Sequence, residues 1–143
     1  MKKIRIGLLV LIVAAVTLFS GCSNEDEVEV ISERFFAHQV SSILQNINQY
    51  AGRTIRMEGM FFSWQELTSA YHFVIRYLDD CCGGGGSIGF ELYMGIFAPF
   101  PDDTWVEVTG VLEVRDGWLP DTPILVVTGI REMHERGQEV VSF

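Results

Sequence analysis

Beyond its third residue the chain contains no lysine, and basic residues are scarce throughout. Over residues 22–143, seven arginines face nineteen acidic side chains, which gives a formal net charge of 7 − 19 = −12. A surface this negative is repelled by phosphate backbones and by anionic lipid headgroups. We therefore expect no nucleic acid among the partners of this protein.

The sequence also lacks the residue patterns of common catalytic sites. It shows no Ser-His-Asp or Cys-His set. The glycine-rich segment at 83–87 lacks the Lys-Ser/Thr pair and the following helix of a phosphate-binding loop. The acidic run within residues 23–32 does not have the spacing of an EF-hand calcium loop. We expect a protein that is not an enzyme.

The first 21 residues have the layout of a bacterial lipoprotein signal. A basic start precedes an apolar run over residues 6–19, whereas a membrane-spanning helix needs about 20 residues. Ser20 and Gly21 then stand directly before Cys22, which resembles the lipobox of bacterial lipoproteins. We expect cleavage before Cys22, lipidation of its new N-terminus, for example with palmitate, and attachment to the extracytoplasmic face of the cell membrane. The alternative is an uncleaved N-terminal anchor.

An acidic segment and a helix follow the leader. Residues 22–32 contain no aromatic residue and are predicted to be a solvated tether, although the sequence VEVI at 28–31 could add a short strand. Apolar residues then recur at helical spacing between Ser32, a suitable cap, and Gly52, a suitable stop. The apolar stripe consists of Phe36, Val40, Ile43, Leu44 and Ile47. This pattern predicts one amphipathic helix.

From residue 53 onward the apolar period changes to two. Five runs separated by turn-forming residues predict strands over 53–64, 70–78, 87–97, 105–114 and 123–130. Glycines stand inside these runs, where sharp strand curvature leaves no room for a side chain: Gly59, Gly89, Gly95, Gly110 and Gly129. A closed barrel also leaves no exposed strand edge. We predict a mainly β domain over residues 33–143, an OB-fold-like five-stranded barrel with an N-terminal amphipathic helix. The alternative is an open antiparallel sheet covered by that helix.

Three ordered blocks, at residues 49–62, 73–82 and 102–114, resemble the C-terminal domain of the YcgQ-like family. That family's pattern is Tyr-x-Gly-Lys-x-Ile, a strand with Ile-x-Arg, a Cys-Cys pair and Trp-Val-x-Val-x-Gly. The matching positions are Tyr50, Gly52, Arg53, Ile55, Ile75, Arg76, Cys81, Cys82, Trp105, Val106, Val108 and Gly110.

Members of this family are described as subunits of a predicted two-component bacterial permease, so the resemblance implies the family's fold and a role beside a permease. The chain departs from the family pattern at Gly83–Gly86, which stand where the family has an Asp-Ala pair. It also has a lipoprotein-like leader in place of the family's transmembrane helices. Fold is therefore expected to transfer better than function.

The adjacent pair Cys81–Cys82 leaves three interpretations open. One cysteine can pack inward as a small apolar residue while the other lies in a loop. An exported pair can also oxidise, but Cα atoms about 3.8 Å apart strain a disulfide and make it redox-active. The third interpretation is a zinc or copper site that adds Asp79, Asp80 or His72 to the thiolates. Adjacent side chains at a strand end point to opposite faces, so the spacing itself does not favour a shared ion.

Four aromatic residues are candidates for an exposed binding face: Trp64, Tyr93, Trp105 and Trp118. Our leading hypothesis is a membrane-tethered, non-enzymatic, OB-like binding module without a cofactor. It would bind a protein partner or a small ligand, with a membrane permease or another envelope protein as the expected partner. The alternative is a metal-handling or thiol-redox lipoprotein that uses Cys81 and Cys82.

Overall fold

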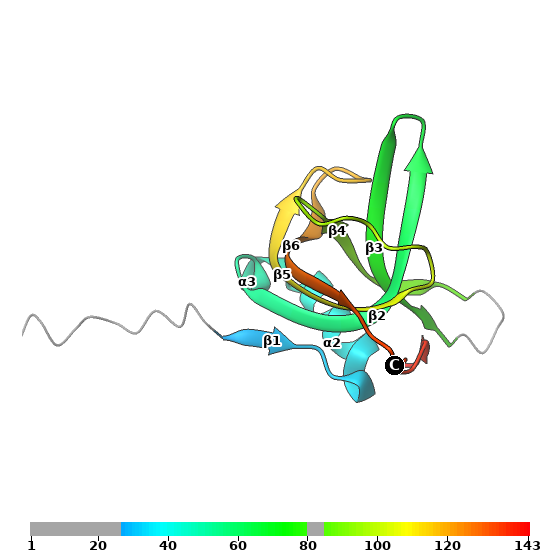
Figure 1. Cartoon of the computed structure of the whole chain (residues 1–143). Coiled ribbons are helices and arrows are strands. Elements are labelled where there is room, and N and C mark those ends of the chain that lie inside the picture. The colour runs from blue at the N-terminus through cyan, green and yellow to red at the C-terminus, as the bar shows by residue number, and fades with distance from the viewer. Residues whose placement is uncertain (1–26, 80–84) are drawn as a thin grey trace, which may run out of the picture.

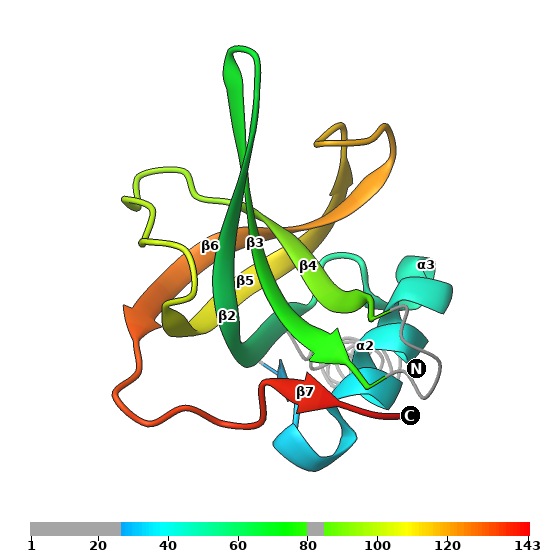
Figure 2. The same cartoon turned by 90° about the vertical axis from the view of Figure 1, so that its right-hand side faces the viewer.

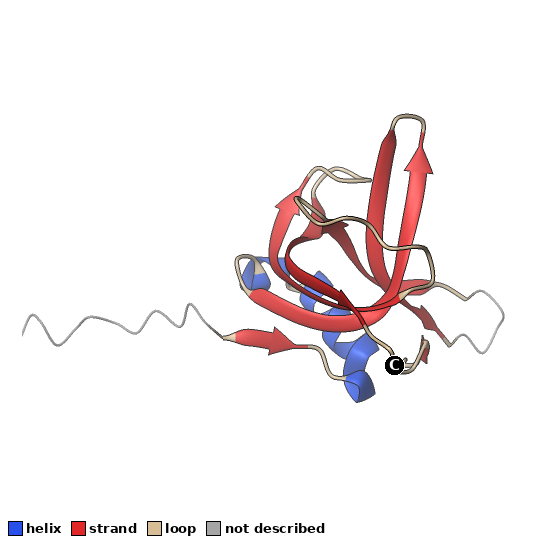
Figure 3. Ribbon diagram, viewed as in Figure 1, coloured by secondary structure: helices blue, strands red, loops and turns tan. Residues whose placement is uncertain are grey.

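Five strands of this protein close into a barrel (Figures 1 and 3). The computed structural model describes residues 27–79 and 85–143. Its elements, in chain order, are β1 (Val28–Val30), the 3-10 helix η2 (Glu33–Phe35), α2 (Phe36–Gln45), α3 (Ile47–Tyr50), β2 (Thr54–Glu66), β3 (Ser69–Leu78), β4 (Ser87–Tyr93), β5 (Trp105–Arg115), β6 (Thr122–Glu132) and β7 (Val140–Val141).

The strand order is that of an OB fold. β2, β3 and β4 form an antiparallel meander, β6 runs parallel to β4, β5 pairs with β6, and β5 returns to β2 and closes the barrel. This Greek-key closure is the arrangement of a five-stranded OB barrel. It confirms the predicted fold class and excludes the open antiparallel sheet.

The predicted tether ends earlier than expected. Residues Val28–Val30 form β1, which pairs in parallel with the start of β2, and Ile31 is 5% exposed in the core. The alternation of VEVI places one set of side chains against the barrel and the other in solvent. Residues 28–31 are thus part of the fold: the alternative in which VEVI adds a short strand is confirmed, and the tether predicted over 22–32 does not extend to them.

The predicted helix is present but divided. Asn46 leaves helical geometry at φ −122° between α2 and α3, and its side-chain amide donates to the Ser42 carbonyl. The face of α2 that is buried consists of Phe36, Ala37, Val40 and Ile43. This helix covers one end of the barrel, opposite the end where the hairpin joining β2 and β3 projects (Figure 2).

Arg76, in the middle of the fold, is a buried cation. It is 2% exposed, and its guanidinium lies 4.3 Å from the ring centroid of Phe36 on α2 and 4.9 Å from that of Trp105 on β5. Its Nε donates to the Glu58 carbonyl on β2 at 3.0 Å. Burial lowers the pKa of Arg76, and the nearby carboxylates of Glu33 and Glu58 oppose that shift. One side chain on β3 thereby contacts the helix and two other strands.

The third predicted strand is shorter than expected. The run over 87–97 ends as a strand at Tyr93. The chain then turns, with Phe97 N–H donating to the Met94 carbonyl and Gly95 at φ +58°, and Ile96 is 96% exposed. Met94 and Phe97, three positions apart, pack against the core from this turn, so the period-two pattern does not describe the residues after Tyr93.

Gly89 allows the close approach of β4 to β3 within the barrel wall. A Cβ at this position would overlap the Val74 carbonyl oxygen, whereas a Cβ at Gly129 on β6 would meet no atom within 4 Å. We expect Gly89→Ala to cost more than about 4 kcal/mol of unfolding free energy or to prevent folding. The matched variant Gly129→Ala should change it by less than about 0.5 kcal/mol. Urea denaturation of both variants measures the difference, and equal losses would contradict this packing.

Candidate binding face

The end of the barrel opposite α2 carries two projecting elements. The β2–β3 hairpin extends beyond the barrel wall, and the connection between β5 and β6 rises beside it (Figure 2). In OB folds, ligands bind on the strand face next to these two connections. Two hollows lie at this end of the described structure, one on each side of the β5–β6 connection.

The first hollow is an apolar groove of about 380 Å³, which we call the aromatic groove. It is lined by Phe62, Trp64, Phe73, Ile75, Tyr77, Ser87 and Trp118. Phe62 and Phe73 are cross-strand neighbours with ring centroids 6.4 Å apart, because the register of β2 and β3 sets them opposite one another on the outer face. Trp118 comes from the β5–β6 connection and meets Phe73 edge-on at 6.5 Å.

Glu91 fixes the position of Trp118. The Oε2 atom of this β4 residue accepts a hydrogen bond from the Trp118 N–H at 3.0 Å, and Glu91 is 7% exposed. A Cβ at Gly117 would lie 2.5 Å from the same oxygen, so a side chain at this position would have to displace the Glu91 carboxylate. The indole therefore stands over the strands with its backbone anchored. Sequence reasoning missed Glu91, and the Gly-Trp dipeptide in a turn was the one available signal.

The second hollow, which we call the acidic cavity, has a volume of about 510 Å³. Its walls include Tyr71, His72, Glu91, Tyr93, Arg115 and Asp116. It adjoins the aromatic groove through Glu91, which pairs across the strands with Phe73. The two hollows thus share the anchored β5–β6 connection as a common wall.

His72 lies at the base of the hairpin. Its Nδ1 is 3.0 Å from the Ser63 hydroxyl, and its ring stacks on Phe61 with centroids 5.5 Å apart. Asp102 accepts a hydrogen bond from the Ser63 backbone N–H at 2.7 Å. The residue types of a Ser-His-Asp set meet here, but the carboxylate is bound to the Ser63 main chain. A catalytic carboxylate would instead hold the histidine ring nitrogen opposite the serine. The contacts join the hairpin to the β4–β5 connection.

The structure brings together part of the predicted aromatic set. Trp64 and Trp118 are each 49% exposed and line the aromatic groove, whereas Tyr93 is 53% exposed and lines the acidic cavity. The prediction for Trp105 is wrong, because this residue is 2% exposed in the core. It begins β5 with its ring turned inward against Arg76, and its indole nitrogen lies 3.5 Å from Glu58 Oε2.

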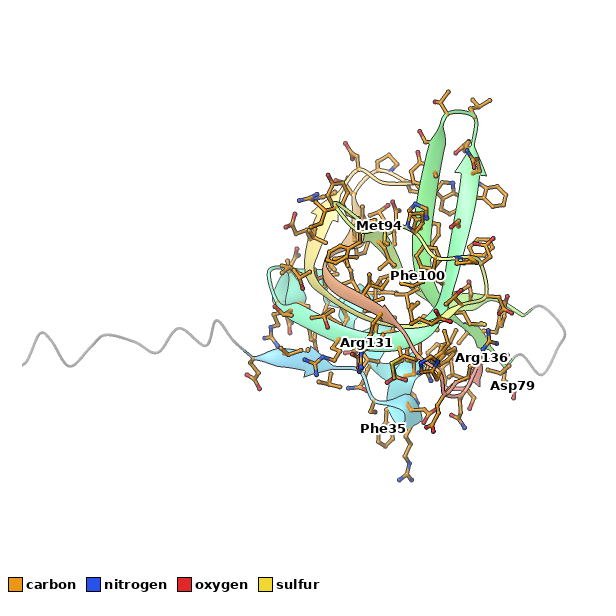
Figure 4. The ribbon with its side chains drawn as sticks, in the orientation of Figure 1. Phe35, Asp79, Met94, Phe100, Arg131 and Arg136 are labelled. Atoms are coloured by element: carbon orange, nitrogen blue, oxygen red, sulfur yellow. The ribbon has the colours of Figure 1, made fainter. Side chains whose placement is uncertain are left out.

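The predicted ligand set around the cysteine pair lies partly within the described residues. His72 and Asp79 are separated by seven positions along β3 and its end, which corresponds to about 23 Å in an extended strand. They cannot share an ion, so they remain the alternative ligands that the sequence predicted, and neither alternative is tested by the described residues. Asp79 lies where the connection from β3 to β4 begins, well apart from Met94 of the acidic cavity (Figure 4).

The other predicted ligands, Asp80, Cys81 and Cys82, lie outside the described residues, as does Cys22. Within residues 27–79 and 85–143, no group of three His, Cys, Asp or Glu side chains could hold a metal ion. A metal or redox role for the pair stays a prediction. The segment that contains it is closed by a hydrogen bond from Leu78 N–H to the Gly86 carbonyl.

The burial of His72 predicts a pH-dependent stability. Burial lowers the pKa of His72 from 6.5, and the charge of Asp102 opposes this shift. The unfolded chain therefore binds more protons between the folded pKa and 6.5, and stability is lost as the pH falls through that range. We expect His72→Gln, which keeps a polar partner for Ser63, to weaken this pH dependence. Unfolding free energies at pH 7.5 and pH 5.5 measure it, and parallel profiles for the two proteins would contradict it.

No curated protein matches this chain. Solved structures that match include the crystal structure of asparaginyl-tRNA synthetase from Pyrococcus horikoshii complexed with asparaginyl-adenylate, at 10% sequence identity and a TM-score of 0.39. That match covers 62% of this chain and 21% of the other, so the chain spans about a fifth of that protein. Among the described residues, no helix has the length and apolar character needed to cross a membrane.

A family model gives the assignment of the chain. The model described as the DUF1980 C-terminal domain matches residues 15–141, which include the three blocks on which the family resemblance depends. That resemblance is confirmed, and the chain belongs to the DUF1980 C-terminal domain family.

Proposed function

We propose that this domain is a non-enzymatic binding module that holds an apolar segment of a protein partner in the aromatic groove. The observation that carries the proposal is the groove itself, where rings from β2, β3 and the β5–β6 connection stand open to solvent around about 380 Å³. Monomeric proteins rarely leave contiguous aromatic surface uncovered unless it binds something. Trp and Tyr are also the side chains that contribute most at the centres of protein interfaces.

The lining of the groove favours a peptide segment over a sugar. Its walls are aromatic and aliphatic, and Ser87 is the one side chain among them that is neither. A sugar ring needs several directed polar partners in addition to a stacking platform, whereas apolar side chains of a peptide need shape and burial. Trp118 is held in place by Glu91 before any partner arrives, so little conformational entropy is lost on binding.

The proposed position of the module is the extracytoplasmic membrane surface, through a lipid at Cys22. Five residues separate Cys22 from Val28 at the start of β1, and such a connection spans at most about 20 Å. The barrel would then stay within reach of proteins embedded in the same membrane. The partner we propose is a membrane or envelope protein, such as the permease that the family resemblance implies.

Photocrosslinking in native membranes tests the module. A photoreactive residue replaces Leu67, which is 97% exposed at the hairpin tip, in the full-length protein. We expect a discrete adduct whose yield falls at least about tenfold with Trp118→Ala, since a central interface tryptophan contributes about 2 kcal/mol or more. The matched variant Leu119→Ala, in the same connection but outside the groove lining, should keep the yield.

Equal yields from the two variants, or no adduct in either, would contradict the proposed function.

The same preparations test the anchor, because Cys22→Ser removes the lipid attachment point. The wild-type protein is expected to carry a lipid on its N-terminal peptide that this variant lacks, and an unmodified Cys22 in the mass spectrum of the wild-type protein would contradict lipid anchoring.

A further inference from the structure

We propose that the acidic cavity binds an organic cation, an alkylammonium or guanidinium group, with Glu91 as its counter-ion. The source we assign is a lysine or arginine side chain of the segment that occupies the aromatic groove, and in this respect the inference rests on the proposed function. The cation site itself stands on the residues of the cavity.

One oxygen of the Glu91 carboxylate has no hydrogen-bond donor among the described residues. It is 7% exposed, and its Oε2 accepts the Trp118 N–H. Its Oε1 accepts no hydrogen bond from the described residues, and Glu91 takes part in none of the ion pairs found among them. A buried carboxylate is costly unless a cation or several donors surround it. Here the carboxylate lines an open cavity, which gives an external cation access to it.

The arginine in the cavity wall is already neutralised. Arg115 Nε donates to Glu113 at 2.7 Å, and its guanidinium lies over the Tyr93 ring at 4.9 Å. Asp116 adds a second carboxylate to the wall without an ion pair among the described residues. The cavity therefore carries uncompensated negative charge from Glu91 and Asp116, and the cation that balances it must come from outside the domain.

The remaining walls select an organic cation over a bare metal ion. Tyr71 supplies an aromatic ring, and Leu92, Met94 and Ile124 supply apolar surface for a hydrocarbon stem. Aromatic rings attract ammonium and guanidinium groups, and more strongly when water is excluded. Oxygen ligands for a metal are few here, since the described residues hold no group of three ligating side chains.

The position of the cavity connects it to the aromatic groove. Glu91 pairs across the strands with Phe73 and bonds to the backbone of Trp118, both of which line the groove. A segment with an apolar side chain beside a lysine or arginine would fill both hollows at once. The net charge of −12 over residues 22–143 also steers basic segments toward this protein.

NMR titration of the full-length protein in detergent micelles tests the cation site. The probes are Nα-acetyl-arginine methylamide and its neutral isostere Nα-acetyl-citrulline methylamide. We expect the arginine probe to shift the amide signals of Glu91, Tyr93 and Gly117 saturably, and to bind at least about tenfold more tightly than the citrulline probe. Glu91→Gln keeps an acceptor for Trp118 N–H and should reduce the arginine affinity about tenfold. Glu132→Gln removes an exposed charge on β6 and should leave the affinity unchanged.

Equal binding of the two probes, or unchanged arginine binding by Glu91→Gln, would overturn the cation site. Agmatine and the dipeptide acetyl-Trp-Arg-methylamide distinguish the source of the cation. Tighter binding of the dipeptide supports a side chain of a bound segment, whereas equal or tighter binding of agmatine overturns that source in favour of a free amine. If the adduct yield does not depend on Trp118 while the arginine probe still binds, the proposed function alone is rejected. If the adduct yield depends on Trp118 but the arginine probe does not bind, the cation site alone is rejected.

Discussion

The stacking of Arg76 between Phe36 and Trp105 is the interaction on which the rest of the structure depends. A guanidinium from β3 contacts the helix that covers the barrel and the strand that closes it, while its Nε satisfies a carbonyl of β2. Each cation–π contact is worth about 0.5–2 kcal/mol when solvent is excluded. An apolar side chain of the same size would fill the space but would not satisfy the Glu58 carbonyl. The helix, the barrel and the register of β2 against β5 are thus joined at one residue.

A similar device operates at the other end of the barrel. There the buried carboxylate of Glu91 holds the β5–β6 connection over the outer face of β3 and β4 through the Trp118 backbone. At the end covered by α2, Glu33 and Glu58 lie near Arg76, and the buried Nη1 of Arg76 has no hydrogen-bond partner among the described residues. At the opposite end, Glu91 has one backbone donor and lines a cavity. Access from this cavity distinguishes Glu91 from Arg76 and marks the end that we propose to bind a partner.

Much of the fold could be predicted from the sequence because it depends on local periodicity. The period-two runs gave the five barrel strands, and Gly59, Gly89 and Gly110 stand where the backbone of a neighbouring strand leaves no room for a Cβ. Gly95 and Gly129 do not follow that rule, since Gly95 lies in a turn with positive φ and Gly129 faces open space. The composition of a run does not show which glycines meet a neighbouring strand.

The candidate site was less predictable because its key contacts are long-range. Glu91 stands on the outer face of β4, where alternation predicts an exposed acid, and it is buried only because residues 117–118 fold over it. Trp105 begins a strand, so no preceding alternation indicates which way its ring points. The distance between His72 and Asp79, in contrast, follows from strand rise and was available from the sequence.

Amide hydrogen exchange of the full-length protein tests the central claim most directly, because it locates bound surface without assuming the identity of the partner. The protein in its native membranes would be compared with the same protein purified in detergent. We expect slower amide exchange in membranes than in detergent, confined to the β2–β3 hairpin from Phe62 to Phe73 and to the β5–β6 connection from Asp116 to Asp121. Identical exchange in both preparations, or protection confined to α2 and β1 at the closed end, would contradict it.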